Sequence, residues 1–174
     1  MNELKKLIRD VPDFPIPGIL FRDITTLLRD GGGLRLAVDA IIKSIGDTQF
    51  DFIAGPESRG FIFGVPTAYA MGKGFIPIRK KGKLPHKTVS KKYGLEYGES
   101  EIEIHADAIR PGQGIIIVDD LLATGGTSRA AAELIEEMGG VVKKFVFLVE
   151  LADLNGRAPI AKYEIESIIK RIIG

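Results

Sequence analysis

Ile115-Ile-Ile-Val-Asp-Asp-Leu-Leu-Ala-Thr-Gly-Gly-Thr-Ser128 is the stretch of sequence that decides the fold. Its four β-branched residues in a row predict a strand that is buried on both faces, as in a parallel sheet. Two aspartates follow at the exit of that strand, where open α/β sheets bind their ligands. The next segment opens a helix that we expect to run to about Met138 and to stop at Gly139-Gly140.

The turn between this strand and this helix predicts a binding site for one phosphate monoester. Glycines let backbone N–H groups turn toward one point, threonine hydroxyls add donors, and the helix dipole adds positive potential. A nucleotide-triphosphate loop would carry a lysine, and this turn has none. The residues expected to hold the phosphate are Ala123, Thr124, Gly125, Gly126 and Thr127.

Asp119 and Asp120 narrow the choice of phosphate compound. Two carboxylates beside the anion site would repel a polyphosphate, so they suit a neutral pair of sugar hydroxyls or a metal ion. Two acceptors next to a phosphate cradle match the 2- and 3-hydroxyls of a ribose 5-phosphate. The alternative is an ordinary βα turn with a solvated acidic corner. The order of strand, acid pair, threonine-glycine turn and helix favours the binding site.

Composition excludes several classes of protein. The 174 residues are the size of one domain, and 24 Lys plus Arg against 23 Asp plus Glu leave no basic field for nucleic acid. Cysteine is absent, which excludes disulfides, thiolate catalysis and cysteine metal sites. The start has no apolar signal core, and no run approaches the length of a membrane span. We expect a cytoplasmic protein that binds neither nucleic acid nor membrane.

The rest of the chain alternates predicted strands and helices, which indicates a mostly parallel sheet flanked by helices. The chain, 1–174, is predicted to be a single domain in which residues 1–30 form an N-terminal arm. Residues 163–173 fit either a helix or a strand. The other expected elements are a helical opening at 2–10, an irregular arm at 11–18, helices at 33–45 and 61–71, and strands at 50–53, 75–79, 100–105 and 141–151.

Two further segments are candidates for anion binding. Ala54-Gly-Pro-Glu-Ser-Arg-Gly60 lies between a predicted strand and a predicted helix, and its amides and Arg59 suit a bidentate grip on a diphosphate. Alone, such a Gly-Pro turn is more often only a turn. Arg79-Lys-Lys-Gly-Lys83 ends a strand with four cations, for which a solvated basic corner is the alternative. The polar stretch 84–98 has no clear periodicity and predicts an irregular lid or loop.

Together these motifs resemble the type I phosphoribosyltransferase family, whose signature is a hydrophobic strand, two acids and a Thr-Gly-Gly-Thr-like loop. The resemblance runs from about residue 10 to residue 152 and is nearest to the branch that acts on adenine. Four segments carry that narrower likeness: Phe14-Pro-Ile-Pro-Gly-Ile-Leu-Phe-Arg-Asp-Ile-Thr25, Ser58-Arg-Gly-Phe61, Arg79-Lys-Lys-Gly-Lys-Leu-Pro85 and Leu95-Glu-Tyr-Gly98.

The resemblance implies an α/β type I phosphoribosyltransferase fold with a central sheet, a small N-terminal hood and a mobile catalytic loop, and it favours a strand at 163–173. It implies transfer of 5-phosphoribose from 5-phosphoribosyl 1-diphosphate to adenine, giving AMP and diphosphate in purine salvage, by a homodimer. An open site would let water capture the sugar cation that forms when diphosphate leaves, which suits a lid at 84–98. Mg²⁺ is the implied cofactor, held mainly by the substrate's diphosphate and ribose hydroxyls.

Residue roles follow from the same resemblance. Diphosphate would contact Glu57, Ser58, Arg59, Arg79 and Lys83. The resemblance also implies that Arg79 or Lys83 reaches across a dimer interface, that the Glu57-Ser58 peptide is cis, and that Lys87 assists. Lys80 and Lys81 are expected to be solvated. Position 56, proline here, is more often aliphatic in the family. The implied catalytic residues are Glu96, Arg59 and Tyr97, with Glu96 as a general acid or base; spacing alone makes it a surface glutamate.

The N-terminal arm is implied to select the base. A backbone segment, Leu20-Phe21-Arg22, would contact the edge of adenine, and Leu151 would pack on the ring; from sequence alone, core packing is the better interpretation of Phe21 and Leu151. His86 and His105 have no ligand partner at metal spacing. Rival functions are the same fold acting on hypoxanthine, guanine, xanthine or orotate, and a regulator that binds DNA, which would need an added DNA-binding domain.

Overall fold

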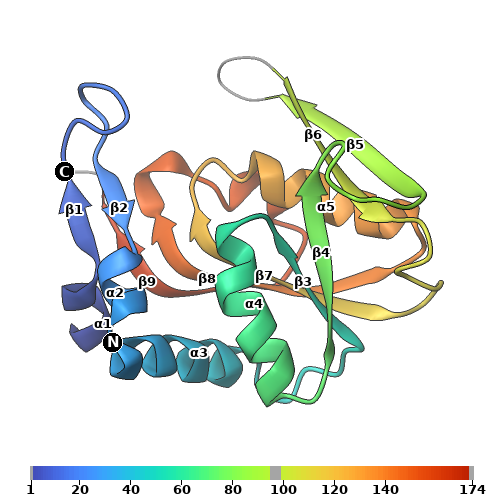
Figure 1. The fold of residues 1–174 in the computed structure, drawn as a ribbon, viewed down its shortest axis with the longest axis horizontal. Helices are drawn as coiled ribbons and strands as arrows, with labels where there is room; N and C mark the ends of the chain where they lie inside the picture. The colour runs from blue at the N-terminus through green and yellow to red at the C-terminus, as the bar shows by residue number, and fades with distance from the viewer. Residues whose placement is uncertain (1, 95–98, 173–174) are drawn as a thin grey trace.

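The computed structural model describes residues 2–94 and 99–172, which form a seven-stranded sheet and a separate two-stranded hairpin (Figure 1). The strand order in the large sheet is β5-β6-β4-β3-β7-β8-β9. The helices are α1 (Asn2–Leu7), α2 (Thr25–Arg29), α3 (Gly31–Ile45), α4 (Arg59–Ala70) and α5 (Gly126–Glu137), with 3-10 turns η1 (Ala152–Leu154) and η2 (Ala158–Ile160). The strands are β1 (Arg9–Val11), β2 (Phe21–Asp23), β3 (Phe52–Pro56), β4 (Gly74–Lys80), β5 (Thr88–Gly94), β6 (Glu99–His105), β7 (Gly114–Leu122), β8 (Val141–Leu151) and β9 (Ile165–Arg171).

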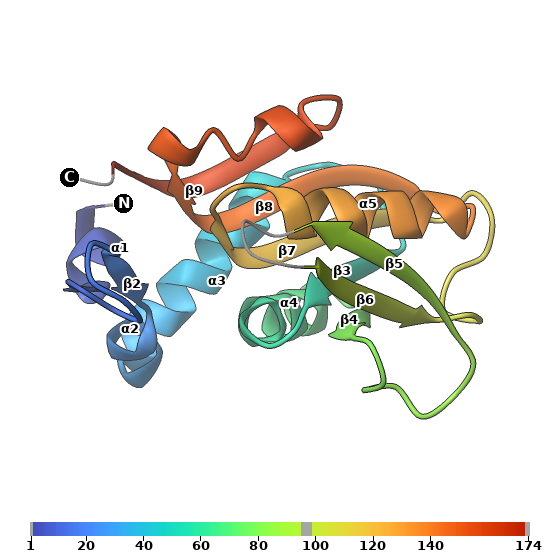
Figure 2. The same cartoon turned by 90° about the horizontal axis from the view of Figure 1, so that it is seen from above.

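Five neighbouring strands, β4-β3-β7-β8-β9, run parallel, and β6 and β5 add an antiparallel pair at one edge. Helices α3 and α4 cover one face of the sheet and α5 covers the other (Figure 2). Along β7, Ile116 and Val118 pack on the face that α3 and α4 cover, while Ile115 and Ile117 pack on the face that α5 covers. The prediction of a strand buried on both faces is therefore confirmed, and so is the prediction of a mostly parallel sheet flanked by helices.

The N-terminal arm forms a small hood beside β9 (Figure 1). Strands β1 and β2 pair antiparallel, and Asp23 accepts hydrogen bonds from Nε of Arg9 (3.0 Å) and from the backbone N–H of Thr25 (2.8 Å). Buried Arg22 contacts Asp10 at 2.6 Å and donates to the carbonyl of Ile172 at 2.9 Å. The expected helical opening is shorter than predicted, because the chain enters β1 two residues after α1 ends.

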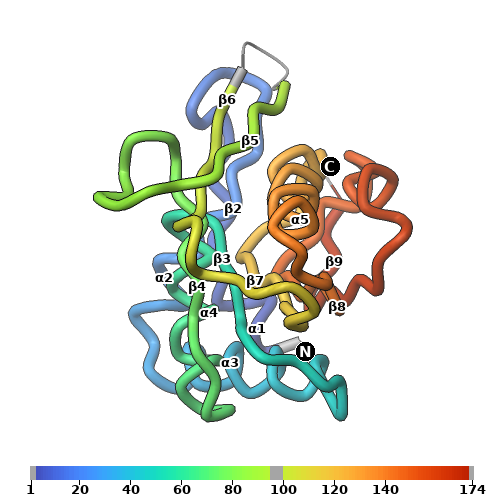
Figure 3. Tube along the Cα trace, turned by 90° about the vertical axis from the view of Figure 1, so that its right-hand side faces the viewer, coloured from blue at the N-terminus to red at the C-terminus, as the bar shows by residue number. Residues whose placement is uncertain are grey.

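The expectation of an irregular stretch at 84–98 is wrong for residues 88–94, which form β5, and positions 95–98 lie outside the described residues. Val89 and Tyr93 pack on the α5 side of the sheet, and Lys91 lies between them and pairs with Glu133 and Glu137 of α5. Residues 89, 91 and 93 do alternate onto one face as in a strand. The middle one is a lysine, so the apolar alternation could not be recognised in the sequence. Figure 3 shows this β5–β6 hairpin beside α5.

The ambiguous segment at 163–173 contains β9, which pairs parallel with β8, so the preference for a strand is confirmed. Ile168 and Ile169, neighbours in sequence, are both buried, which explains why the pattern also fitted a helix. Among the described residues, no helix combines the length and apolarity that crossing a bilayer requires.

Candidate active site

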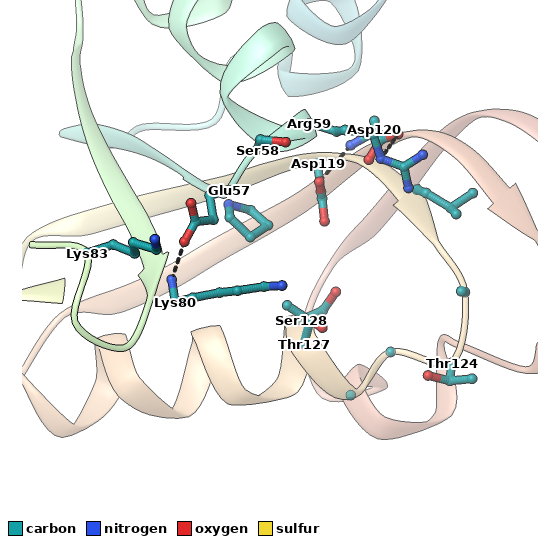
Figure 4. Close-up of a pocket in the computed structure, with 15 residues that line it drawn as sticks. Glu57, Ser58, Arg59, Lys80, Lys83, Asp119, Asp120, Thr124, Thr127 and Ser128 are labelled. Atoms are coloured by element: carbon teal, nitrogen blue, oxygen red, sulfur yellow. Dashed lines mark hydrogen bonds and ion pairs between the residues drawn. The ribbon is translucent and has the colours of Figure 1, made fainter. Parts of the chain in front are cut away.

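A cavity of about 500 Å³ lies at the carboxyl ends of β3 and β7, the edge at which the sequence places its anion loops (Figure 4). It brings together residues from three segments that are far apart in the sequence. The cavity is lined by Pro56, Glu57, Ser58, Arg59, Lys80, Lys83, Asp119, Asp120, Leu121, Ala123, Thr124, Gly125, Gly126, Thr127 and Ser128.

The predicted phosphate loop connects β7 to the first turn of α5 and forms one wall of the cavity. Gly125 caps the helix with φ of +80°, a left-handed conformation that glycine adopts without strain. The first turn of α5 therefore lies at the cavity, and its backbone N–H groups have no partner within the helix. Ser128 also lines it, and the sequence analysis did not select this residue although it ends the quoted stretch. Thr127 and Tyr93 place their hydroxyl oxygens 3.2 Å apart, which ties the loop to β5.

Both aspartates line the cavity and are not a solvated corner: the Asp119 carboxylate points toward the phosphate loop, and the Asp120 carboxylate lies beside Arg59 (Figure 4). Oδ1 of Asp119 accepts a hydrogen bond from the backbone N–H of Asp120 at 2.9 Å. Burial raises the pKa of both carboxyls, and the charge of Asp120 raises the pKa of Asp119 further. Arg59 opposes this effect, because its Nε lies 3.1 Å from Oδ2 of Asp120. The pair, with Asp120 buried and Asp119 half-buried, is thus an acidic site that favours a hydroxyl or cationic partner.

The second anion loop runs from β3 into α4, and it carries the expected cis peptide between Glu57 and Ser58. Gly60 packs this loop tightly against β7: an added Cβ would lie 3.0 Å from Oδ1 of Asp119 and 3.1 Å from the carbonyl oxygen of Val118. Figure 4 shows Glu57 and Ser58 of this loop across the cavity from Thr127 and Ser128 of the phosphate loop and first turn of α5.

The basic corner at 79–83 divides into two parts. Arg79 donates to Oε2 of Glu57 at 2.9 Å and does not line the cavity, whereas Lys80 and Lys83 do. The Lys80 side chain, expected to be merely solvated, extends toward the phosphate loop (Figure 4). Burial opposes ionisation of Glu57, but hydrogen bonds from the Lys80 backbone and Arg79 outweigh it and lower the Glu57 pKa. Lys81 lies elsewhere, 3.7 Å from Glu101.

Comparison with known proteins agrees with this geometry. The family model described as the phosphoribosyl transferase domain matches residues 25–173. The chain belongs to the phosphoribosyltransferase family. It is 55% identical over 169 residues to the adenine phosphoribosyltransferase of Agathobacter rectalis, covering 97% of each chain, and 58% identical over 168 residues to that of Desulfitobacterium hafniense, again covering 97% of each.

Solved structures of the same family superpose over nearly the whole chain. The adenine phosphoribosyltransferase of Thermoanaerobacter pseudethanolicus gives a TM-score of 0.96 at 50% identity, covering 98% of this chain and 99% of that one. The Saccharomyces cerevisiae enzyme, solved with an imino-altritol bisphosphate and adenine, gives 0.91 at 38% identity, covering 96% and 97%. The likeness includes the N-terminal hood, which precedes the part matched by the family model.

In this phosphoribosyltransferase, the residues predicted to select the base lie beside the cavity and not among the residues that line it. Phe21 packs edge to face against Phe14, with ring centroids 5.1 Å apart, and the guanidinium of Arg59 lies 5.6 Å from the Phe21 ring centroid. Leu20 is half-buried, and Leu151 is nearly buried at the end of β8. Arg59 therefore connects the hood to the acid pair.

Two other predictions are not tested by the described residues. Glu96 and Tyr97, the implied proton-handling pair, lie outside them. Within the described part of this phosphoribosyltransferase, no group of three or more His, Cys, Asp or Glu side chains has the arrangement of a metal site. His86 and His105 lie with ring centroids 6.3 Å apart. The carboxylates of Asp119, half-buried, and Asp120, buried, line the cavity and fit a magnesium ion that takes most of its ligands from the substrate.

Proposed function

We propose that this protein is an adenine phosphoribosyltransferase, which transfers 5-phosphoribose from 5-phosphoribosyl 1-diphosphate to adenine and releases AMP and diphosphate. One observation carries the proposal: the predicted phosphate-monoester loop, the acid pair and the basic anion loop line one cavity beside the hood. These three features match the three anionic or hydroxylated parts of the donor. Relatives at 49–58% identity over most of the chain carry this name.

The cavity suggests one orientation for the donor. The 5-phosphate would accept hydrogen bonds from residues 123–128, and the ribose 2- and 3-hydroxyls would donate to Asp119 and Asp120. The diphosphate would then lie against the loop at 57–59, with Lys80 and Lys83 as counter-charges. In this orientation C1 of the ribose lies between the two anion loops and faces the hood.

The chemistry breaks the bond between C1 and the diphosphate oxygen and forms a bond from C1 to a purine nitrogen. The diphosphate leaves with the electron pair, C1 passes through an oxocarbenium-like state, and the purine nitrogen gives up its proton. Glu96 is the proposed proton acceptor, with Tyr97 near the ribose. Magnesium, when bound, would neutralise charge on the leaving diphosphate. Arg59, Lys80 and Lys83 add positive charge, so the main contributions of the chain are orientation and charge stabilisation.

A homodimer belongs to the proposal. Arg79, assigned to diphosphate by resemblance, is held by Glu57 within its own chain and does not line that chain's cavity. The role proposed for Arg79 therefore requires that it reach the cavity of a partner subunit. Sedimentation equilibrium at micromolar concentration should give about twice the mass of one chain, 18.9 kDa. A strict monomer with full activity would remove this part of the proposal.

The deciding experiment is an assay of purified protein with Mg²⁺, 5-phosphoribosyl 1-diphosphate and each base in turn. We expect adenine-dependent formation of AMP and diphosphate in equal amounts. Competition with hypoxanthine, guanine, xanthine and orotate tests the rival function in which the same fold acts on another base. If any of these bases reacts faster than adenine, that base would replace adenine as the proposed substrate. A gel-shift assay with random duplex DNA tests the other rival function, a regulator that binds DNA. Absence of AMP formation with active donor would overturn the proposal.

A further inference from the structure

Two glycines bring the phosphate loop into direct backbone contact with the turn that follows β8. An added Cβ on Gly156 would lie 2.1 Å from the carbonyl oxygen of Ala123, and an added Cβ on Gly125 would lie 2.2 Å from the carbonyl oxygen of Gly156. Both distances are far inside van der Waals contact, so no side chain fits between the two segments. The position of the turn therefore limits where the backbone of the phosphate loop can lie.

The turn itself is held by Arg157, the residue after Gly156. Its Nε and Nη2 each donate to a different carboxylate oxygen of Glu150, both at 2.8 Å. The same guanidinium donates to the carbonyl of Ile165 at 3.1 Å and to Oγ of Ser167 at 3.2 Å. Arg157 thus fastens the turn to β8 through Glu150 and to β9 through two more contacts.

The Glu150 carboxylate is a stable anchor for this arrangement. Its side chain is only 8% exposed, and hydrogen bonds from Arg157 hold its pKa below the ordinary value against the effect of burial. Bidentate arginine–carboxylate pairs combine strength with a fixed geometry. Both side chains of the pair stay charged at neutral pH. Neither Glu150 nor Arg157 is among the residues that line the cavity.

We propose that Gly156 and Arg157 are positioning residues for the 5-phosphate site: Arg157 fixes the turn, and Gly156 sets the backbone of residues 123–125 in the shape that receives the phosphate. This proposal rests on the proposed function, because it assumes that the loop binds a ribose 5-phosphate. Neither residue touches the substrate. A displacement of the loop by about 1 Å would misdirect its N–H donors, and such misplacements cost up to about 100-fold in activity.

The test compares Gly156→Ala with Gly31→Ala, a control at which an added Cβ meets no atom within 4 Å. Isothermal titration would measure binding of ribose 5-phosphate and, separately, of inorganic diphosphate with Mg²⁺. Gly156→Ala should weaken ribose 5-phosphate binding by about 10-fold or more, because only that ligand depends on the loop. Diphosphate binding should change less than about twofold, and the control should change neither.

Arg157→Lys is the second variant, which keeps the charge but loses the bidentate geometry. It should weaken ribose 5-phosphate binding by about fivefold, the effect of one or two hydrogen bonds, and raise the donor KM more than it lowers kcat. The proposal is overturned if both variants melt like wild type and bind ribose 5-phosphate with wild-type affinity. It is also overturned if both ligands weaken equally, since that indicates general damage. Wild-type protein that binds no ribose 5-phosphate would instead refute the proposed function.

Discussion

Arg59 and Asp120 form an ion pair inside the cavity, with Nε of the guanidinium 3.1 Å from Oδ2 of the carboxylate. Arg59 starts α4 and Asp120 lies near the end of β7, and the guanidinium also lies over the ring of Phe21 in the hood. Asp120 is almost fully buried, so its charge is costly without a partner. Arg59 thereby links the region proposed for the base to the region proposed for the ribose.

Arg59→Ala should move the acidic limb of the pH profile of kcat/KM to higher pH. Burial raises the pKa of Asp120, and the positive charge of Arg59 lowers it. Without that charge the Asp120 pKa rises further, so the carboxylate that we propose accepts the ribose hydroxyls forms only at higher pH. The donor KM should also rise by about 10-fold or more, because the contact proposed between Arg59 and diphosphate is lost. Arg35→Ala, on the exposed face of α3, is the control. An unshifted acidic limb in Arg59→Ala would contradict the assignment.

Asp119→Asn should stabilise the fold while it weakens nucleotide binding. Burial and the neighbouring Asp120 raise the pKa of Asp119 well above 3.8. The folded state therefore binds this proton more tightly than the unfolded state, and stability is lost as pH rises above about 4. Asparagine carries no charge and keeps an oxygen for the N–H of Asp120. The variant should melt about 2–4 °C higher at pH 7.5, corresponding to roughly 1 kcal/mol, with a smaller difference near pH 4.

Two controls accompany the Asp119 measurement. Asp39→Asn, at a side chain that is 63% exposed, should leave the melting temperature nearly unchanged at both pH values. Titration with AMP should show that Asp119→Asn binds the nucleotide at least about 10-fold more weakly than wild type. A variant that melts lower than wild type at pH 7.5 would show that the carboxylate contributes to stability and that its pKa is not raised.

Lys80→Ala and Lys81→Ala form a matched pair of neighbouring lysines. Lys80 lines the cavity, whereas Lys81 lies near Glu101 and Glu103. Removing a charged donor to diphosphate costs about 1.5–3 kcal/mol, which is about 10-fold to 150-fold in affinity. Product inhibition by diphosphate should therefore weaken by that factor in Lys80→Ala and by less than twofold in Lys81→Ala. Equal effects in the two variants would mean that only general positive charge matters.

The sequence predicted the elements whose signal is local. The stretch 115–128 contains a buried strand, an acid pair, a turn and a helix start in one continuous segment, so each part confirms the others. The structure places them as expected, with α5 ending before Gly139. Segment 88–94 was missed because its central lysine interacts with acids on a helix that follows about forty residues later. That partner cannot be known from a local pattern.

The choice between Arg79 and Lys80 shows a second limit. Ile76 and Ile78 are buried with the α5 layer, and the alternation of a strand puts Lys80 on that same face, where the phosphate loop lies. The alternation is visible in the sequence, but the face that meets the loop is known only once the sheet is assembled. The contact between Arg59 and Phe21 likewise joins segments that only the tertiary fold brings together.

Asp23→Asn should loosen the hood, and the effect should depend on pH. Hydrogen bonds from Arg9, followed by those from Thr25, lower the pKa of Asp23 from 3.8 to about 2. The folded state therefore binds this proton less tightly than the unfolded state. The stability that the carboxylate contributes is present above about pH 4 and is lost as pH falls from about 4 to about 2.

Urea unfolding of wild type and Asp23→Asn between pH 3 and pH 7 measures the stability that the Asp23 carboxylate contributes. The difference in unfolding free energy should be largest at pH 5–7 and should shrink below about pH 4, because the wild-type carboxylate then becomes protonated. Since Phe21 lies two residues away on β2, the adenine KM should rise more than the donor KM. Arg9→Ala removes the main partner of Asp23. It should therefore lower the unfolding free energy less in the Asp23→Asn background than in the wild-type protein. A pH-independent difference, or fully additive effects, would mean that this pair does not hold the hood in place.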